Sequence, residues 1–254
     1  WPEGPEDLDP LICAFVEDAW CEGETQGTIG NLLSAFSLVE RGIVRHLTGA
    51  WRLYGAWGRN ELRSRCVPMT LIMLRAFAGL AVAWGWLDMA LVLLLGCQCL
   101  LRTGEMVGIR LADIFVGALE AGALLNLPDT KTFKRSGIAE QVNVDDPDLV
   151  TFAITFAASK GLQPGDLLLQ SHPAAFRRRF KELQIGLELQ QLDILPYSIR
   201  RGSATELFRR TNSFDRVLTR GRWQSIRTAR KYVNEALQDL GQLSLSARQI
   251  SLMN

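Results

Sequence analysis

Apolar residues recur at helical spacing along much of the chain. Between residues 28 and 47 the recurring apolar positions are Ile29, Leu32, Phe36, Val39 and Ile43. A repeat of three or four residues predicts an amphipathic helix in this stretch, with Thr28 as its N-cap. Weaker patterns of the same kind predict helices over residues 8–20 and 50–62.

The helical pattern breaks at Cys66-Val67-Pro68, because proline disfavours the helical conformation of the residue before it. We therefore expect two domains. The first is a small helical domain over residues 1–66, and the second is a larger domain over residues 67–254.

Residues 76–101 form the single candidate for a membrane span, but Asp88 lies near the middle of this stretch and Gln98 near its end. These polar residues leave no uninterrupted apolar run of the roughly 20 residues that a transmembrane helix needs. The pattern instead predicts two buried helices that meet near Gly85, in a protein with no membrane partner.

Short runs of strand-forming residues follow between residues 114 and 144, on either side of a polar turn, PDTKTFKRSG. Glycine and proline in the turn predict a hairpin or a small antiparallel sheet with a lysine-rich tip. Further helices are expected over residues 173–187, 198–210, 214–218 and 225–240. The predicted fold class is mainly α (α+β): a helical first domain, and a mostly helical second domain with a small sheet.

The overall charge is close to neutral, with 28 Lys and Arg against 27 Asp and Glu in 254 residues. The distribution is uneven, because residues 171–232 contain 14 of these cations and only five of the acids. Such a basic region is typical of surfaces that bind phosphate groups. Solvated helix faces are the ordinary alternative, and composition leaves both open.

The five cysteines are odd in number and show neither a Cys-x-x-Cys spacing nor a nearby histidine. This pattern argues against a disulfide framework and against a zinc site, so we expect reduced thiols in the core and neither a metal nor a cofactor. The sequence begins Trp-Pro-Glu without a basic leader. We therefore expect no secretion signal and an intracellular protein, cytoplasmic or nuclear.

Four separated segments carry residue types suited to phosphodiester chemistry: LLRTGEMVGIRLADI, the DTKTFKRSG turn, PYSIRRGSAT and GRWQSIRTARKY. The candidate catalytic residues in them are Arg102, Lys131, Tyr197, Arg200, Trp223 and Tyr232, with Glu105 in support. Their order resembles the tyrosine recombinase (phage integrase) family, as does the spacing of 23 residues from Arg200 to Trp223 and nine more to Tyr232. The resemblance covers residues 68–254 well and the first domain only as a generic core-binding domain.

The resemblance implies that the first domain is a SAM-like DNA-binding domain and that the second is catalytic. It implies double-stranded DNA as the partner, and a homotetramer on paired DNA sites. Tyr232 would attack a phosphate to form a 3′-phosphotyrosyl bond and release a 5′ hydroxyl. A partner strand would then reverse this step, without ATP.

Physical chemistry gives these residues the same roles. Arg102 and Arg200 are forked, always-protonated donors that match the geometry of a phosphate. Lys131 is a candidate general acid, with Lys134 as the competing choice. Trp223 can donate a hydrogen bond through its indole N–H but cannot exchange a proton in catalysis.

The pattern departs from the family at Tyr197, where histidine is usual. The unperturbed pKa of tyrosine is about 10, so a phenol is a poor base near neutral pH. We expect Tyr197 to hydrogen-bond the phosphate and the chemistry to be weakened. Two alternatives stay open: a catalytically impaired, mobile-element-derived DNA-binding protein, and an enzyme similar to type IB topoisomerases.

Further arginines are expected to contact the DNA backbone. They are Arg177, Arg178, Arg179, Arg201, Arg222 and Arg230. Beyond Tyr232 the tail is rich in leucine, with Gly241 expected to interrupt its helix. The resemblance implies that this tail docks on a neighbouring protomer, whereas packing on its own domain is the ordinary alternative.

Overall fold

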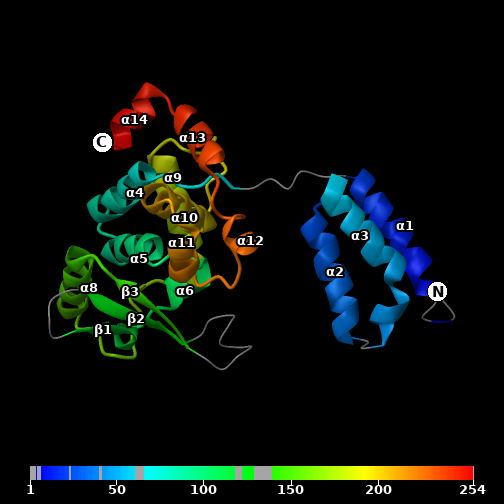
Figure 1. The fold of residues 1–254 in the computed structure, drawn as a ribbon, viewed down its shortest axis with the longest axis horizontal. Coiled ribbons are helices and arrows are strands. Elements are labelled where there is room, and N and C mark those ends of the chain that lie inside the picture. Colours follow the sequence, from blue (N-terminus) through cyan, green and yellow to red (C-terminus); the bar gives the residue numbers. More distant parts are fainter. Residues whose placement is uncertain are drawn as a thin grey trace. The chain divides into compact units, whose positions relative to one another are not determined.

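The computed structural model describes residues 4, 7–22, 24–39, 42–60, 66–117, 122–128 and 139–253. The chain divides into two compact units, Trp1–Arg65 and Cys66–Asn254, which are both visible in Figure 1. Each unit has a hydrophobic core of its own.

The smaller unit is helical and consists of α1 (Leu8–Cys21), α2 (Gln26–Val39), the 3₁₀ helix η2 (Ile43–His46) and α3 (Thr48–Asn60). Asp9 of α1 ties the bundle together, because its carboxylate accepts hydrogen bonds from the N–H groups of Gly49 and Ala50 at the start of α3. These N–H groups have no partner within the helix itself, so the contact also caps α3.

The helix predicted over residues 28–47 is shorter than expected and starts earlier. α2 begins at Gln26, and the Thr25 hydroxyl accepts a hydrogen bond from the Thr28 N–H at 3.2 Å. Thr25 is therefore the capping side chain, and the prediction for Thr28 is wrong.

The core of the larger unit is built on α4 (Leu71–Ala83) and α5 (Leu87–Gln98). Thr70 caps α4 by accepting from the Met73 N–H, and Gly85 adopts a φ of 75° between the two helices. A positive φ favours glycine, so this residue permits the tight connection. The prediction of two buried helices meeting near Gly85 is confirmed.

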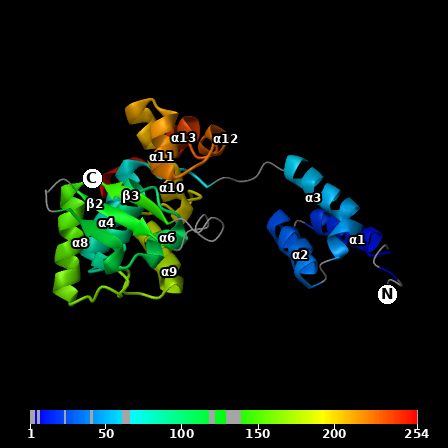
Figure 2. The ribbon, with the colours of Figure 1, turned by 60° about the horizontal axis from the view of Figure 1, so that its bottom comes forward.

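The sheet has three antiparallel strands in the order β1 (Ile114–Val116), β2 (Ala123–Leu127) and β3 (Glu140–Val144). Alternate residues of β2 and β3 are buried against the core, and Figure 2 shows the strands beside α8 (Pro147–Lys160). Sequence reasoning missed α8. Its start signals are nevertheless present, since Asp146 caps it and Pro147 occupies its first turn.

The remaining elements of the larger unit follow the core and the sheet along the chain. They are α6 (Thr103–Gly108), the 3₁₀ helix η3 (Leu111–Asp113), α9 (Pro173–Gly186), α10 (Pro196–Thr211), α11 (Phe214–Gly221), α12 (Ile226–Ala229), α13 (Glu235–Leu243) and α14 (Ala247–Met253). The mainly helical class with a small antiparallel sheet is confirmed.

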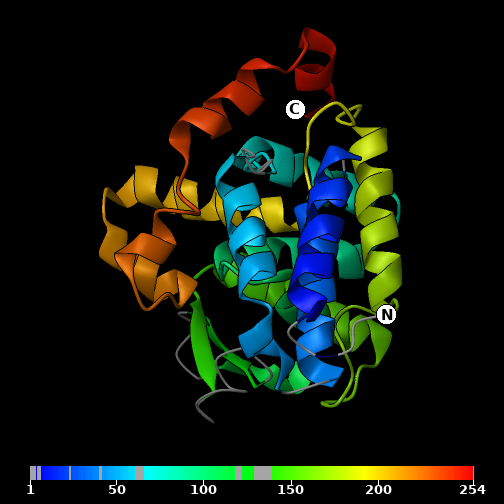
Figure 3. The same cartoon turned by 90° about the vertical axis from the view of Figure 1, so that its right-hand side faces the viewer.

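The single helix predicted over residues 225–240 is divided in two. α12 ends at Ala229, and Asn234 starts α13 by accepting a hydrogen bond from the Leu237 N–H. Gly241 does not interrupt α13. It is buried where an added Cβ would lie 2.5 Å from Cγ1 of Val67, so close packing explains the glycine. The last helix, α14, lies against α4 of the same chain (Figures 1 and 3).

All five cysteines are free, but only Cys66 and Cys99 are buried, whereas Cys21 is exposed. The expectation that all of these thiols lie in the core is therefore wrong. Among the described residues, no helix combines the length and the apolar character needed to cross a bilayer.

Candidate active site

Three arginines surround two glutamates in the larger unit. Glu105 is the centre of the cluster: its carboxylate lies 2.5 Å from Nη1 of Arg102, 2.5 Å from Nη2 of Arg222 and 3.7 Å from Nη1 of Arg200. Glu140 lies 3.0 Å from Nε of Arg222 and 3.7 Å from Nη1 of Arg102. The cluster therefore has one positive charge more than it has negative charges, which suits it to an anion.

Local structure places each of these side chains. Arg102 precedes α6, and Glu105 in the first turn of that helix accepts the Arg102 backbone N–H at 2.8 Å. Arg200 lies in the buried part of α10, and Glu140 is the first residue of β3. Arg222 directly follows α11, so four separate segments of the chain meet at one point.

Arg200 is almost completely buried, with 1% of its surface exposed. Its Nη2 donates to the Gly221 carbonyl at 2.6 Å, while Nε and Nη1 make no hydrogen bond to any described residue. Burial, followed by the charges of Arg222 and Arg102, lowers its pKa to about 10, so it stays charged at neutral pH. Buried donors without partners are costly, and an anionic ligand would satisfy them.

Tyr232 lies beside this arginine. Its ring centroid is 4.3 Å from that of Trp223, and Cζ of Arg200 is 5.6 Å from the Tyr232 ring. Tyr232 belongs to the turn that follows α12, not to a helix as expected. A phenol therefore lies beside a guanidinium whose Nε and Nη1 donate no hydrogen bond within the described part of the chain.

Tyr197, the second residue of α10, also lies beside Tyr232, with ring centroids 5.6 Å apart. Burial raises the pKa of Tyr197, and a hydrogen bond with the Tyr232 side chain raises it further. The phenol of Tyr197 therefore stays protonated near neutral pH. It can donate a hydrogen bond, but it cannot serve as a base there.

The structure thus brings together five of the six predicted catalytic residues, Arg102, Tyr197, Arg200, Trp223 and Tyr232, with the supporting Glu105. The sixth, Lys131, lies outside the described residues, as does its competitor Lys134.

Sequence reasoning missed the part that Glu140 and Arg222 take in this cluster. No spacing rule links Glu140 to the other segments, because only the folded sheet brings the start of β3 next to α6. The Gly221 carbonyl, which orients Arg200, is a backbone group and leaves no trace in the residue pattern.

Two of the six arginines expected to contact DNA have side chains that are buried in the protein. Arg201 is 3% exposed and donates from Nη1 to the Cys66 carbonyl, so its role is internal. The side chain of Arg222 is only 6% exposed and is held by Glu105 and Glu140. This burial contradicts the expectation that Arg201 and Arg222 contact the DNA backbone.

The other four arginines that were expected to contact DNA lie nearer the surface. Arg177, Arg178 and Arg230 are exposed. Arg179 is half-buried, with Nη1 3.1 Å from Asp88 and its Cζ 5.1 Å from the Trp86 ring centroid. Arg178 has an i,i+4 ion pair with Glu182 at 3.7 Å, and Cζ of Arg230 lies 5.6 Å from the Phe214 ring centroid. Both side chains are nevertheless exposed, so these two and Arg177 can reach a phosphate backbone.

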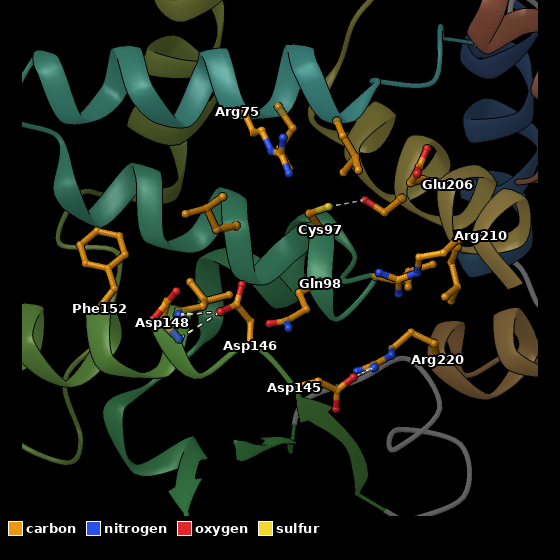
Figure 4. Close-up of a pocket in the computed structure, with 17 residues that line it drawn as sticks. Arg75, Cys97, Gln98, Asp145, Asp146, Asp148, Phe152, Glu206, Arg210 and Arg220 are labelled. Carbon is orange, nitrogen blue, oxygen red and sulfur yellow. Dashed lines mark hydrogen bonds and ion pairs between the residues drawn. The ribbon is translucent and has the colours of Figure 1, made fainter. Parts of the chain in front are cut away.

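Apart from the arginine cluster, a pocket of about 680 Å³ lies between α4, α5, α8 and α10 (Figure 4). Arg75 and Arg210 point into it, Arg220 is ion-paired with Asp145 at its rim, and several further acidic side chains line it. Four acidic side chains and three arginines line this pocket, and none of the predicted catalytic residues does, so it suits an anion less well than the cluster around Glu105.

No protein-family model matches the sequence, and no curated protein matches it significantly. Solved structures do match. A lambda integrase dimer bound to a COC′ core site superposes with a TM-score of 0.61 at 16% identity, over 93% of this chain and 83% of that one. The Tn1549 transposon integrase in complex with circular intermediate DNA superposes with a TM-score of 0.58 at 12% identity, over 92% of this chain and 84% of that one.

The XerH site-specific recombinase bound to palindromic difH substrate, a post-cleavage complex, gives a TM-score of 0.57 at 12% identity, over 91% of this chain and 75% of that one. Identities this low establish the architecture alone. The structural neighbours bear out the resemblance seen in the sequence, and the chain has the fold of the tyrosine recombinases and integrases.

Proposed function

We propose that this protein is a site-specific DNA recombinase that cleaves and rejoins double-stranded DNA through Tyr232. The observation that carries the proposal is the position of Tyr232 against Arg200, a buried guanidinium whose Nε and Nη1 donate no hydrogen bond to the described residues. The matched structures support it, because recombinases and integrases bound to DNA are among them.

In the proposed reaction the scissile phosphate enters beside Arg200 and Arg102. Their guanidiniums bind its non-bridging oxygens, and this binding strengthens as negative charge develops in the transition state. The Tyr232 oxygen attacks phosphorus, the P–O5′ bond breaks, and a 3′-phosphotyrosyl bond forms. The phosphotyrosyl bond keeps the energy of the broken one, so a 5′ hydroxyl from another strand can reverse the step.

Two protons have to move in this step. The phenol of Tyr232 must lose one, which passes to solvent water in our proposal, and the departing 5′ oxygen must gain one. Lys131 is our candidate for the acid. Tyr197, kept protonated by burial and by its hydrogen bond with Tyr232, donates to a phosphate oxygen instead of acting as the base.

The DNA surface that we propose includes the exposed Arg177, Arg178 and Arg230 of the larger unit. The helical unit Trp1–Arg65 is the second DNA-binding element, and four copies of the chain would assemble on two paired sites. One of the matched structures is a lambda integrase tetramer bound to a Holliday junction, which supports this arrangement.

A binding-only protein is the second candidate, and Tyr197 in place of a histidine is the observation that favours it. The experiment starts by selecting bound duplexes from a randomised library, which defines a DNA site. A duplex of that sequence, nicked next to the cleavage position, then traps a covalent adduct on a denaturing gel, because the released fragment diffuses away.

An adduct, followed by joining of two duplexes at the selected sequence, is the result that we expect. Selective binding without an adduct would favour the binding-only protein. Relaxation of supercoiled DNA by a monomer, without joining of separate duplexes, would point to the topoisomerase-like alternative.

A further inference from the structure

Arg222 occupies a backbone position that ordinarily belongs to glycine. It is the residue directly after α11, and it adopts the left-handed conformation with φ 54° and ψ 45°. This conformation is common at the ends of helices, but a side chain makes it unfavourable. An arginine here strains the backbone, and strain of this kind tends to accompany function.

The side chain makes contacts that glycine could not. Nη2 lies 2.5 Å from Glu105, Nε lies 3.0 Å from Glu140, and Nη1 donates to the Cys99 carbonyl at 3.3 Å. One guanidinium therefore joins α6, β3 and the end of α5. All three of its nitrogens are engaged, so Arg222 has little left to offer a ligand.

These contacts determine how many hydrogen-bond donors of Arg102 and Arg200 remain available to a ligand. Glu140 is close to Arg102 as well, and Glu105 is close to all three arginines. Without Arg222 the two carboxylates would face two guanidiniums, and the surplus positive charge of the cluster would vanish. An incoming anion would then compete with Glu140 for Arg102.

We propose that Arg222 is a positioning residue of the phosphate site: it binds Glu105 and Glu140, so that Arg102 and Arg200 keep donors free for an anion. The inference rests on the proposed function only in taking this anion to be a DNA phosphate. It assigns Arg222 no contact with the reacting atoms.

The test uses the full chain and orthovanadate, a phosphate analogue, as the probe. Thermal unfolding with and without vanadate reports binding, because a ligand that binds the native state raises the melting temperature. The variants are Arg222→Gln, Arg222→Gly and the double variant Arg222→Gln with Glu140→Gln. Arg75→Gln removes a cation outside the cluster and is the matched control.

We expect vanadate to stabilise the wild type and the control, but not Arg222→Gln. The double variant should recover the response, because removing the Glu140 carboxylate restores the surplus positive charge and releases Arg102. Arg222→Gly should also lose the response, although glycine suits the left-handed backbone. If Arg222→Gln does not fold, the glycine and double variants carry the test.

Four results would overturn the inference: no vanadate response in the wild type, a normal response in Arg222→Gln, a normal response in Arg222→Gly, or no recovery in the double variant. Adduct formation on the nicked duplex is measured in parallel, and it should fall about 10- to 100-fold in Arg222→Gln, as when supporting residues of other sites are removed. A vanadate pattern as expected, with no adduct even in the wild type, would reject DNA cleavage while supporting the role of Arg222.

Discussion

Arg200 lies over the ring of Trp223, with its Cζ 4.9 Å from the ring centroid. Its Nη2 also donates to the carbonyl of Gly221, two residues before that tryptophan. The stacking contact and the hydrogen bond together fix the plane of the guanidinium. Nε and Nη1 donate no hydrogen bond to any described residue, although Nη1 lies 3.7 Å from the Glu105 carboxylate. A donor fixed in this way needs no reorganisation when charge develops on a bound phosphate.

Arg200→Lys tests this arrangement. The substitution keeps the positive charge but removes the planar fork, so adduct formation should fall by about 100- to 1,000-fold, the usual effect of removing one oxyanion donor. DNA affinity should change little, because one contact among many is affected. Arg209→Lys, which alters an exposed ion pair with Asp239, is the control. If adduct formation changed equally in Arg200→Lys and Arg209→Lys, the planar fork of Arg200 would have no specific role.

Tyr197→Phe removes the phenol that we propose donates to the phosphate. Adduct formation should fall, while the melting temperature should stay close to that of the wild type because Tyr197 is 40% exposed. Tyr197→His should keep or raise activity and should introduce a rate increase near pH 6.5, where imidazole loses its proton. The wild type should lack this step, because the pKa of Tyr197 is raised above its ordinary value.

Rates of adduct formation across pH 5.5–8.5 distinguish these outcomes. Equal rates and identical pH profiles in all three proteins would remove Tyr197 from the mechanism.

The basic surface predicts a steep salt dependence. The logarithm of the binding constant should fall by about 0.9 per phosphate contacted for each tenfold rise in salt. Arg177→Gln and Arg178→Gln should each reduce this slope by about 1. Arg179→Gln, on the same helix, is the matched control: it should lower the melting temperature, because Arg179 is bound to Asp88, and change the slope less. A flat salt dependence in the wild type would contradict DNA binding.

The tail presents two exposed leucines on α13, Leu240 at 61% and Leu243 at 81%. Because α14 lies against its own α4, we expect contact with a neighbouring protomer to involve α13. Replacing both leucines with serine should leave binding to one half-site intact and reduce cooperative occupancy of paired half-sites. Gel-shift titration on single and paired sites measures this. Unchanged cooperativity would assign the tail to intramolecular packing.

The elements that the sequence predicted well have strong local signals. α4 and α5 follow from a long apolar stretch with Gly85 at the turn, and β2 and β3 follow from strand-forming runs beside a polar turn. The division between α12 and α13 was missed, because a short turn capped by Asn234 does not disturb the apolar pattern.

The candidate site could be predicted only in part. The order and spacing of Arg102, Arg200 and Tyr232 were sufficient to propose that they meet. The pairing of Glu140 with Arg222, and the burial of Arg201, depend on where β3 and Cys66 come to lie in three dimensions. Neighbouring arginines, such as Arg200 and Arg201, look alike in a sequence although their guanidiniums have different partners.

The identity of the nucleophile is the central claim. The most direct measurement is mass spectrometry of peptides from the covalent adduct trapped on the nicked duplex, together with the variants Tyr232→Phe and Tyr54→Phe. We predict a nucleotide on the peptide that contains Tyr232, no adduct in Tyr232→Phe with DNA affinity nearly unchanged, and a normal amount of adduct in Tyr54→Phe. An undiminished adduct in Tyr232→Phe, or a nucleotide on Tyr197, would contradict the account.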